Sequence, residues 1–222
     1  MELNEVMRTT FAARDYTEEP LPDAILYDII DNARFAPSGG NRQGNHVIIV
    51  KETNTREALA TLAMPPAKRY MAQLQAGENP WNTVLPSNLT DQQIEDTVVP
   101  EMLFKPYITA AVVLVFLVDL KAVAALDQHL DRVGIIGGAS IYPFVWNVLL
   151  GARQAGFGGT ITTLPIANEP AVQELLHIPE HYAVCAVMPL GKPVKQLTRL
   201  KRRSVEEITS LERFDGEVFK PS

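Results

Sequence analysis

Residues 36–43 read Ala-Pro-Ser-Gly-Gly-Asn-Arg-Gln, and they separate a helical pattern from a strand pattern. Upstream, Ala24–Phe35 has apolar residues at the spacing of one helix face. Downstream, His46–Lys51 is a short run rich in β-branched residues, which predicts a strand. Small and polar residues in such a break let the main chain turn sharply and come close to a bound ring. The break is therefore a candidate binding turn between two elements of the fold.

Helical and strand patterns are mixed along the rest of the chain. Further helices are predicted over 1–9, 54–75 and 133–155. The second of these is expected to be interrupted near Pro65-Pro66. Two continuous apolar runs, Ala110–Val118 and His181–Met188, predict strands buried on both faces. The mixed order favours an α/β or α+β class in which helices wrap a few strands.

The composition suits one globular domain over residues 1–222. The chain is 46% hydrophobic and 21% charged, which is enough apolar material for a sizeable core. Residues 77–97 are polar and proline-bearing, which predicts a surface excursion that forms a substrate wall or is an insertion with no direct role. Residues 189–222 read as an extended basic C-terminal tail. The net charge of −6 gives no electrostatic reason to bind nucleic acid, so none is an expected partner.

The single cysteine and the N-terminus favour a cytoplasmic protein. Cys185 cannot form an internal disulfide, and its apolar surroundings favour a core residue over a nucleophile. The first residues have neither the basic region nor the apolar core of a signal peptide. Val133–Ala152 carries no charge and is about long enough to cross a bilayer, but its glycines and Asn147 favour a buried helix. No membrane partner is expected.

Several kinds of site lack their sequence motifs. His177 and His181 are four residues apart, but Pro179 between them disrupts helical pairing, and no cysteine-rich or His-Glu-x-x-His pattern occurs. No metal site is therefore expected. The chain has no Gly-x-Ser-x-Gly, P-loop or Gly-x-Gly-x-x-Gly motif. A hydrolytic triad and a Rossmann cofactor site are therefore not supported.

A scattered set of residues could bind an anion. Arg14 follows the first helix, the turn at 38–41 follows the second, and Lys201-Arg202-Arg203 stands near the end of the chain. A phosphorylated cofactor needs several cationic donors, and guanidinium suits two-point phosphate contact. A charge cluster is more often a solvated face, and Gly-Gly is more often only a turn. On spacing alone, both interpretations stay open.

Four segments together resemble the nitroreductase family. The turn at 36–43 is similar to the family's Ala-Pro-Ser, two small residues and Asn-x-Gln. Arg14-Asp15-Tyr16, followed by Pro20-Leu21-Pro22, resembles an arginine–x–aromatic motif and a Pro-Val-Pro helix start. Asn147–Gly159 resembles the family's central helix, and 202–207 resembles its closing basic segment. The segments follow the family's order and span nearly the whole chain.

The resemblance implies a fold, a cofactor and an activity. The implied fold is α+β and nitroreductase-like, with a central mixed, mainly antiparallel sheet wrapped by helices, in an intertwined homodimer. The implied cofactor is FMN at the dimer interface, with NADH or NADPH as electron donor. The implied activity is an oxidoreductase that passes hydride through the flavin to nitroaromatics, quinones or similar small acceptors by a ping-pong mechanism. Because water can supply protons to an open cleft, no catalytic residue is expected.

The resemblance also assigns cofactor-binding residues. Arg14 would hold the ribityl chain or the pyrimidine edge of the flavin, and Lys105 would lie near flavin N1 and O2, where a cation stabilises reduced flavin. Gly158 and Gly159 would bring backbone amides to the ring, and Lys201 and Arg203 would bind the phosphate. The isoalloxazine would be lined from the partner subunit by Pro37, Ser38 and Asn41 of the turn, and Gly39 and Gln43 would also be cofactor-binding residues.

The chain departs from the family pattern at two places. The family often has an arginine and a serine shortly before the position of Arg14, where Thr10, Phe11 and Ala12 stand here. The family's Gln-Pro-Trp is Gln43-Gly44-Asn45. These changes favour one alternative, a flavin-binding or sensing module without turnover. Two further alternatives are a relative performing dehalogenation, dehydrogenation or flavin breakdown, and a protein without a cofactor. The sequence does not decide the physiological acceptor or between NADH and NADPH.

Overall fold

Four strands form the central layer of the fold. The computed structural model describes residues 1–221, and its sheet has the order β1-β2-β4-β3. The strands are β1 (Asn45–Val50), β2 (Val112–Asp119), β3 (Gly158–Gly159) and β4 (Tyr182–Gly191). All three strand pairs are antiparallel. The expected α+β class is confirmed, but the expected mixed sheet is corrected, because in the described chain only the isolated bridge of Ala12 to Gly159 is parallel.

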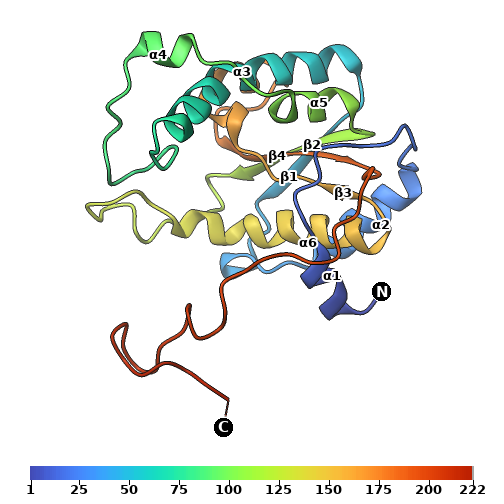
Figure 1. Cartoon of the computed structure of the whole chain (residues 1–222). Coiled ribbons are helices and arrows are strands. Elements are labelled where there is room, and N and C mark those ends of the chain that lie inside the picture. Colours follow the sequence, from blue (N-terminus) through green and yellow to red (C-terminus); the bar gives the residue numbers. More distant parts are fainter. Residues whose placement is uncertain (222) are drawn as a thin grey trace.

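Helices cover both faces of this sheet (Figure 1). Their bounds are α1 (Leu3–Thr9), α2 (Asp23–Ala33), α3 (Thr53–Gln75), α4 (Asp91–Glu95), α5 (Lys105–Thr109), α6 (Tyr142–Gln154) and α7 (Glu169–Leu175). α2 and α6 pack on one face, with α1 beside α6. α3, α5 and α7 cover the other face. The two helical layers enclose two separate hydrophobic cores.

β2 is the strand that both cores share. Leu114 and Phe116 point into the core beneath α2 and α6, and Val113 and Val115 point into the core beneath α3, α5 and α7. Because successive side chains alternate between the faces of a strand, a continuous apolar run is what a strand between two helical layers requires. The runs predicted at 110–118 and 181–188 are therefore confirmed as β2 and β4, and that at 46–51 as β1.

The predicted interruption of the helix at 54–75 is wrong. α3 continues through Pro65 and Pro66 from Thr53 to Gln75. A proline inside a helix removes the N–H that would bond to the carbonyl four residues before it. At Pro66 that carbonyl belongs to Leu62, and it accepts a hydrogen bond from the side-chain amide of Asn168 at 2.8 Å. A side chain from a distant segment therefore satisfies the acceptor that the helix leaves free.

The helix predicted over 133–155 is confirmed only in its second part. α6 begins at Tyr142, and residues Ile136–Ser140 form a short 3-10 turn instead. Three glycines in 134–138 weaken helix formation there. The buried carboxylate of Asp127 also accepts the Ile135 N–H at 2.7 Å and the Ile136 N–H at 3.3 Å. These backbone donors are therefore held in a loop, which periodicity could not indicate.

The chain outside the two cores is largely irregular. Residues 77–97 run out from α3 along the surface and contain only the short helix α4 (Figure 1). After β4, the described residues up to 221 form no further helix or strand and extend away from the body (Figure 1). Within the described residues, no helix combines the length and apolar character needed to cross a membrane.

Asp127 makes the stability of this fold dependent on acid pH. The Ile135 N–H, first, and the Arg132 guanidinium lower the pKa of Asp127 from its usual value to about 2. A lowered folded-state pKa means that the stabilisation is complete above about pH 4 and is lost as the pH falls toward about 2. We expect Asp127→Ala to lower the melting temperature at neutral pH and to flatten its fall in acid, measured by circular dichroism.

Asp131→Ala, at an exposed position of the same loop, is the matched control. It should keep the acid dependence of the unaltered chain. An Asp127→Ala protein that loses stability in acid as steeply as the unaltered chain would contradict this role.

Candidate active site

A cavity of about 660 Å³ lies between α3, the segment that follows β3, and β4. Its volume is within the range of small-molecule and cofactor sites. Thr160, Ile161 and Thr162 line one side as the chain leaves β3, and Val184 and Cys185 contribute from β4. Further lining comes from α3, α5 and the start of the 77–97 excursion. Its members are Pro66, Tyr70, Pro80, Trp81, Pro106 and Tyr107.

Arg14 reaches this cavity because the segment around it is hydrogen-bonded to β3 and β4. The Ala13 N–H donates to the Gly159 carbonyl at 2.9 Å. The buried Tyr16 hydroxyl lies 2.6 Å from the Ala13 carbonyl and 3.0 Å from that of Pro189. Arg14 lies between these anchors, is half-buried and lines the cavity. Within residues 1–221 it takes part in none of the ion pairs.

Two buried polar groups in the cavity wall have no hydrogen-bond partner among the described residues. They are the Tyr107 hydroxyl and Thr160 Oγ1, on side chains that are 1% and 4% exposed. An unpaired buried donor costs about 1–3 kcal/mol, so each such group calls for a partner. Burial raises the pKa of the Tyr107 phenol, and the neighbouring Thr162 side chain offsets this only in part, although the two groups do not meet hydrogen-bond geometry. The phenol therefore stays protonated and able to donate. Together with Arg14, these groups fit the carbonyl-bearing edge of a flavin.

The turn at 37–43 is preformed but lies outside this cavity. Gly40, Asn41 and Gln43 have positive φ angles of 61°, 52° and 49°, which glycine and asparagine tolerate best. Ser38 Oγ accepts the Gln43 N–H at 2.9 Å, and the Gly39 N–H donates to Ser140 Oγ at 3.1 Å. Pro37, Asn41 and Gln43 are exposed. The turn therefore presents a fixed, accessible surface that is not part of the cavity lining of its own chain.

Gly158 and Gly159 are buried by their own chain. A Cβ atom on Gly159 would lie 2.7 Å from the Pro189 carbonyl, and one on Gly158 would lie 3.0 Å from a ring carbon of Pro193. Close pairing of β3 with β4 therefore requires both glycines, whatever else they do. That pairing also sets where Thr160 and Thr162 enter the cavity.

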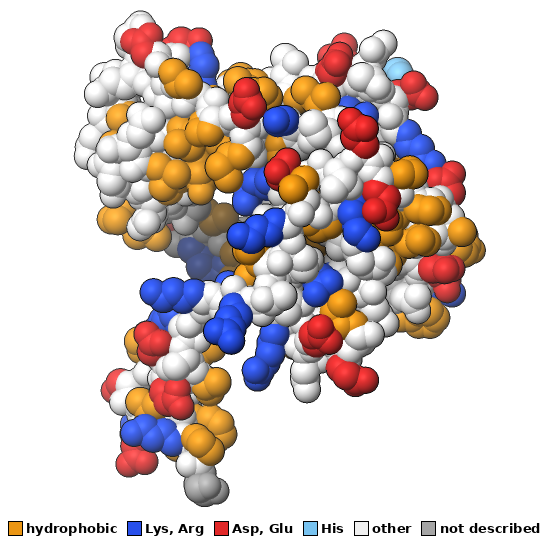
Figure 2. Space-filling model, turned by 45° about the vertical axis from the view of Figure 1, so that its right-hand side comes forward, with side chains coloured by type: hydrophobic (Ala, Val, Ile, Leu, Met, Phe, Trp, Pro, Cys, Tyr) orange, Lys and Arg blue, Asp and Glu red, His pale blue; other side chains and the backbone are white. Residues whose placement is uncertain are grey.

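The predicted cations occupy different parts of the structure. Lys105 begins α5, is exposed and lies 3.7 Å from Glu101, while its neighbour Pro106 lines the cavity. Lys201 and Arg203 are exposed on the tail, where Arg203 donates to the Glu207 carbonyl. Figure 2 shows Lys and Arg side chains gathered around a hollow where the tail leaves the body. Of the predicted residues, only Arg14 lines the cavity of the described chain.

The sequence did not single out most of the side chains that line the cavity. Tyr70, Trp81, Tyr107 and Tyr142 belong to no motif and come from four separate segments. The one local signal is the polar run that begins at Thr160, directly after Gly158 and Gly159. A strand that turns polar at its end next to a glycine pair indicates a wall residue, and this signal could have identified Thr160.

The protonation state of Cys185 argues against its acting as a nucleophile in the cavity. Burial first, and the nearby Glu169 carboxylate second, raise the pKa of the Cys185 thiol to about 12. The thiol is therefore protonated at neutral pH, and the thiolate is the reactive form. In the described part of the chain, no three or more His, Cys, Asp or Glu side chains gather in a way that could hold a metal ion.

Known proteins resemble this chain in sequence and in fold. A family model described as "Nitroreductase family" matches residues 7–192. Iodotyrosine deiodinase 1 of Rattus norvegicus is 24% identical over 210 residues, covering 93% of this chain and 68% of the relative. An NADH dehydrogenase of Thermus thermophilus is 25% identical over 185 residues, covering 82% of each. A crystal structure of oxidized iodotyrosine deiodinase bound to FMN and 3-iodo-L-tyrosine has a TM-score of 0.69 at 17% identity, covering 96% of this chain and 100% of that one.

The raised pKa of Cys185 predicts a thiol that resists modification. At about pH 8 a group with a pKa of about 12 is about one ten-thousandth thiolate, against about a quarter for an exposed cysteine. We expect Ellman's reagent to modify the folded protein at least about a thousandfold more slowly than the protein unfolded in guanidinium, which should release one equivalent. Rapid stoichiometric reaction of the folded protein would show that the thiol is accessible and ionised.

Proposed function

The chain belongs to the nitroreductase family and is a flavin oxidoreductase of that family, and from this premise we propose that it passes a hydride from NADH or NADPH to a small electron acceptor. The proposed cofactor is FMN, and the proposed acceptors are nitroaromatics, quinones or similar compounds. Donor and acceptor would use the same cleft in turn, in a ping-pong mechanism. The observation that carries the proposal is a cavity with one half-buried guanidinium and two unpaired buried hydroxyls.

The residues of the cavity have distinct proposed roles. Bound FMN would supply the chemistry of accepting and releasing a hydride. Arg14 would hold its ribityl chain or pyrimidine edge, and Thr160 and Tyr107 would donate hydrogen bonds to its polar atoms. Cys185 would stay neutral and add an apolar contact. None of these side chains is assigned as a proton donor or acceptor, because water in an open cleft can serve.

A second copy of the chain would complete the site. The turn residues Pro37, Ser38 and Asn41 would line the ring bound by the other subunit, and Gly39 and Gln43 would also contact the cofactor, which would give a role to a rigid turn that does not line its own cavity. Lys201 and Arg203 of the tail would bind the phosphate, and Lys105 would lie near flavin N1 and O2. Gly158 and Gly159 would bring main-chain amides close to the ring. The homodimer is therefore part of the proposal.

A second candidate activity is reductive dehalogenation of an aromatic substrate. It is favoured by the similarity to iodotyrosine deiodinases, which extends over 93% of this chain. Assays with an iodinated phenol and with a nitroaromatic, under the same reductant, would separate the two activities. Iodide release that exceeds nitro reduction would favour the deiodinase alternative.

The proposal predicts a yellow dimer that releases FMN on denaturation. Size-exclusion chromatography with light scattering should give twice the chain mass, and the released flavin should approach one equivalent per chain. NADH or NADPH should be oxidised when a quinone or nitroaromatic is added. A colourless monomer that takes up no added FMN would refute the proposal.

Arg14 and Arg203 should both contribute to FMN affinity. Hydrogen bonds from a charged donor are worth about 1.5–3 kcal/mol, so Arg14→Ala and Arg203→Ala should each weaken FMN binding about tenfold or more. Flavin fluorescence during titration of the apoprotein measures this. Arg8→Ala on α1 and Arg213→Ala further along the tail are the exposed controls. An affinity equal to that of the control would remove that arginine from the site.

A further inference from the structure

We propose that Trp81 determines acceptor specificity by stacking on a planar, electron-poor aromatic ring in the cavity. The inference deepens the proposed function and rests on it. Trp81 and Pro80 begin the 77–97 excursion, and both line the cavity beside Tyr70 of α3. Neither side chain is assigned a catalytic role, so the role that remains for them is to select and orient the acceptor.

The backbone of Trp81 is held in an unfavourable conformation. Its φ angle is 56°, in the left-handed region that a bulky side chain rarely occupies. The Trp81 N–H donates to the side-chain carbonyl of Gln73 at 3.0 Å, and Gln73 is only 3% exposed. A strained residue persists only where its surroundings fix it, and such residues concentrate at binding sites. The buried amide of Gln73 is what fixes this one.

The Glu78 carboxylate links Gln73 of α3 to the later part of the 77–97 excursion. Glu78 accepts the Gln73 side-chain N–H at 3.2 Å, the Ser87 hydroxyl at 2.6 Å and the Asn88 N–H at 3.0 Å. The Ser87 and Asn88 donors hold the pKa of Glu78 below its usual range. The carboxylate therefore stays ionised at neutral pH and ties the returning chain to the start of the excursion.

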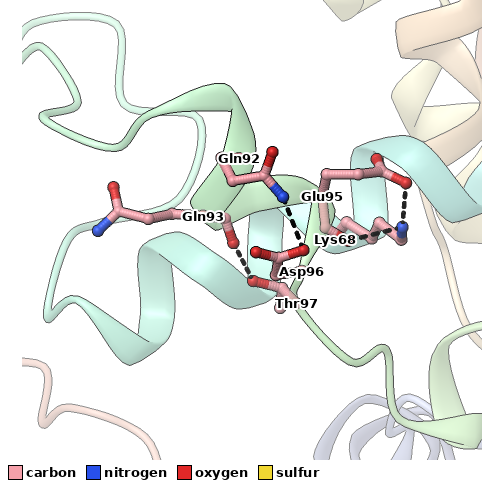
Figure 3. Close-up of polar contacts among 6 residues, drawn as sticks. All are labelled: Lys68, Gln92, Gln93, Glu95, Asp96 and Thr97. Atoms are coloured by element: carbon pink, nitrogen blue, oxygen red, sulfur yellow. Dashed lines mark hydrogen bonds and ion pairs between the residues drawn. The ribbon is translucent and has the colours of Figure 1, made fainter.

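The far end of the excursion is also tied to α3 (Figure 3). Lys68 of α3 lies 2.6 Å from the Glu95 carboxylate and 2.8 Å from the Glu95 carbonyl. Thr97 donates to the Gln93 carbonyl at 2.7 Å, which closes the last turn of α4. Because both ends are anchored on one helix, Trp81 belongs to a preformed wall, and binding an acceptor need not order it.

The chemistry of this wall selects a class of acceptor. Trp81 is 43% exposed, so part of its aromatic surface is not used by core packing. The Arg69 guanidinium lies 4.7 Å from the ring centroid of Trp81 but is not part of the cavity lining, whereas Arg14 is. Offset stacking favours a flat ring, and the Arg14 guanidinium favours one with nitro, quinone or carboxylate oxygens. The favoured acceptor is therefore planar, aromatic and electron-poor or anionic.

The test compares two kinds of acceptor with the FMN-loaded enzyme. Steady-state kinetics with NADH would be measured for 4-nitrobenzoate and 1,4-naphthoquinone, which can stack, and for ferricyanide, which is not planar. Removing a stacking partner weakens binding by about tenfold, so Trp81→Leu should raise KM for both aromatic acceptors by about that factor. The rate with ferricyanide and the FMN content should stay within about twofold. Trp81→Phe should recover most of the lost affinity.

The second tryptophan provides a matched control. Trp146 lies on α6, is 41% exposed and does not line the cavity. Trp146→Phe should leave every KM within about twofold of that of the unaltered enzyme. An equal loss with ferricyanide, or an unchanged KM for the aromatic acceptors in Trp81→Leu, would overturn the proposal. An unaltered protein that holds FMN and reduces ferricyanide would, in either case, leave the proposed function standing.

A binding measurement tests Trp81 without turnover. The chain has two tryptophans, so Trp146→Phe leaves Trp81 as its one indole fluorophore. Titration of this variant with 4-nitrobenzoate should quench the remaining emission along a saturable curve. The converse variant, Trp81→Phe, should show only linear collisional quenching of Trp146. Linear quenching in both variants would overturn the inference even if the protein proved to have no reductase activity.

Discussion

β2 exposes neither face to water, and the rest of the molecule is arranged around that constraint. Its residues alternate between two cores, each closed by a different set of helices. Burying both faces of a strand requires a helical layer above and below, and its buried backbone groups need a paired strand on each edge. β1 and β4 pair with the two edges of β2, β3 pairs with the outer edge of β4, and the segment of Arg14 bonds to β3. The cavity forms at that edge, where the sheet ends and polar residues become accessible.

Local sequence patterns were sufficient to predict the strands whose two faces are both apolar. The apolar runs at 110–118 and 181–188 predicted β2 and β4, because a strand between two layers needs no polar positions. Prediction failed where a distant side chain replaces a backbone partner. Asp127 holds the N–H groups of Ile135 and Ile136 in a loop, although their apolar surroundings indicated a helix.

The candidate site was predictable only in its backbone motifs. Arg14 and the turn at 37–43 belong to short contiguous patterns, and the structure gives each a fixed backbone, through pairing with β3 and through left-handed residues respectively. Tyr107 and Trp81 belong to no pattern and reach the cavity through α5 and the 77–97 excursion. Their positions depend on long-range packing, which no local spacing contains. The proposed preference of the site for one acceptor over another would therefore be encoded in the parts of the chain that are hardest to infer.

The proline pair in α3 has a consequence for the cavity. The side-chain amide of Asn168 donates a hydrogen bond to the Leu62 carbonyl, the one that Pro66 leaves free. The segment after β3 is therefore hydrogen-bonded to the middle of α3. Pro66 and Tyr70 line the cavity from α3, and residues between Thr160 and Ala167 line it from the segment after β3. The hydrogen bond therefore links two segments that both line the cavity, and the carbonyl left free by Pro66 contributes to their spacing. A ligand that needed these segments to separate there would have to break this hydrogen bond.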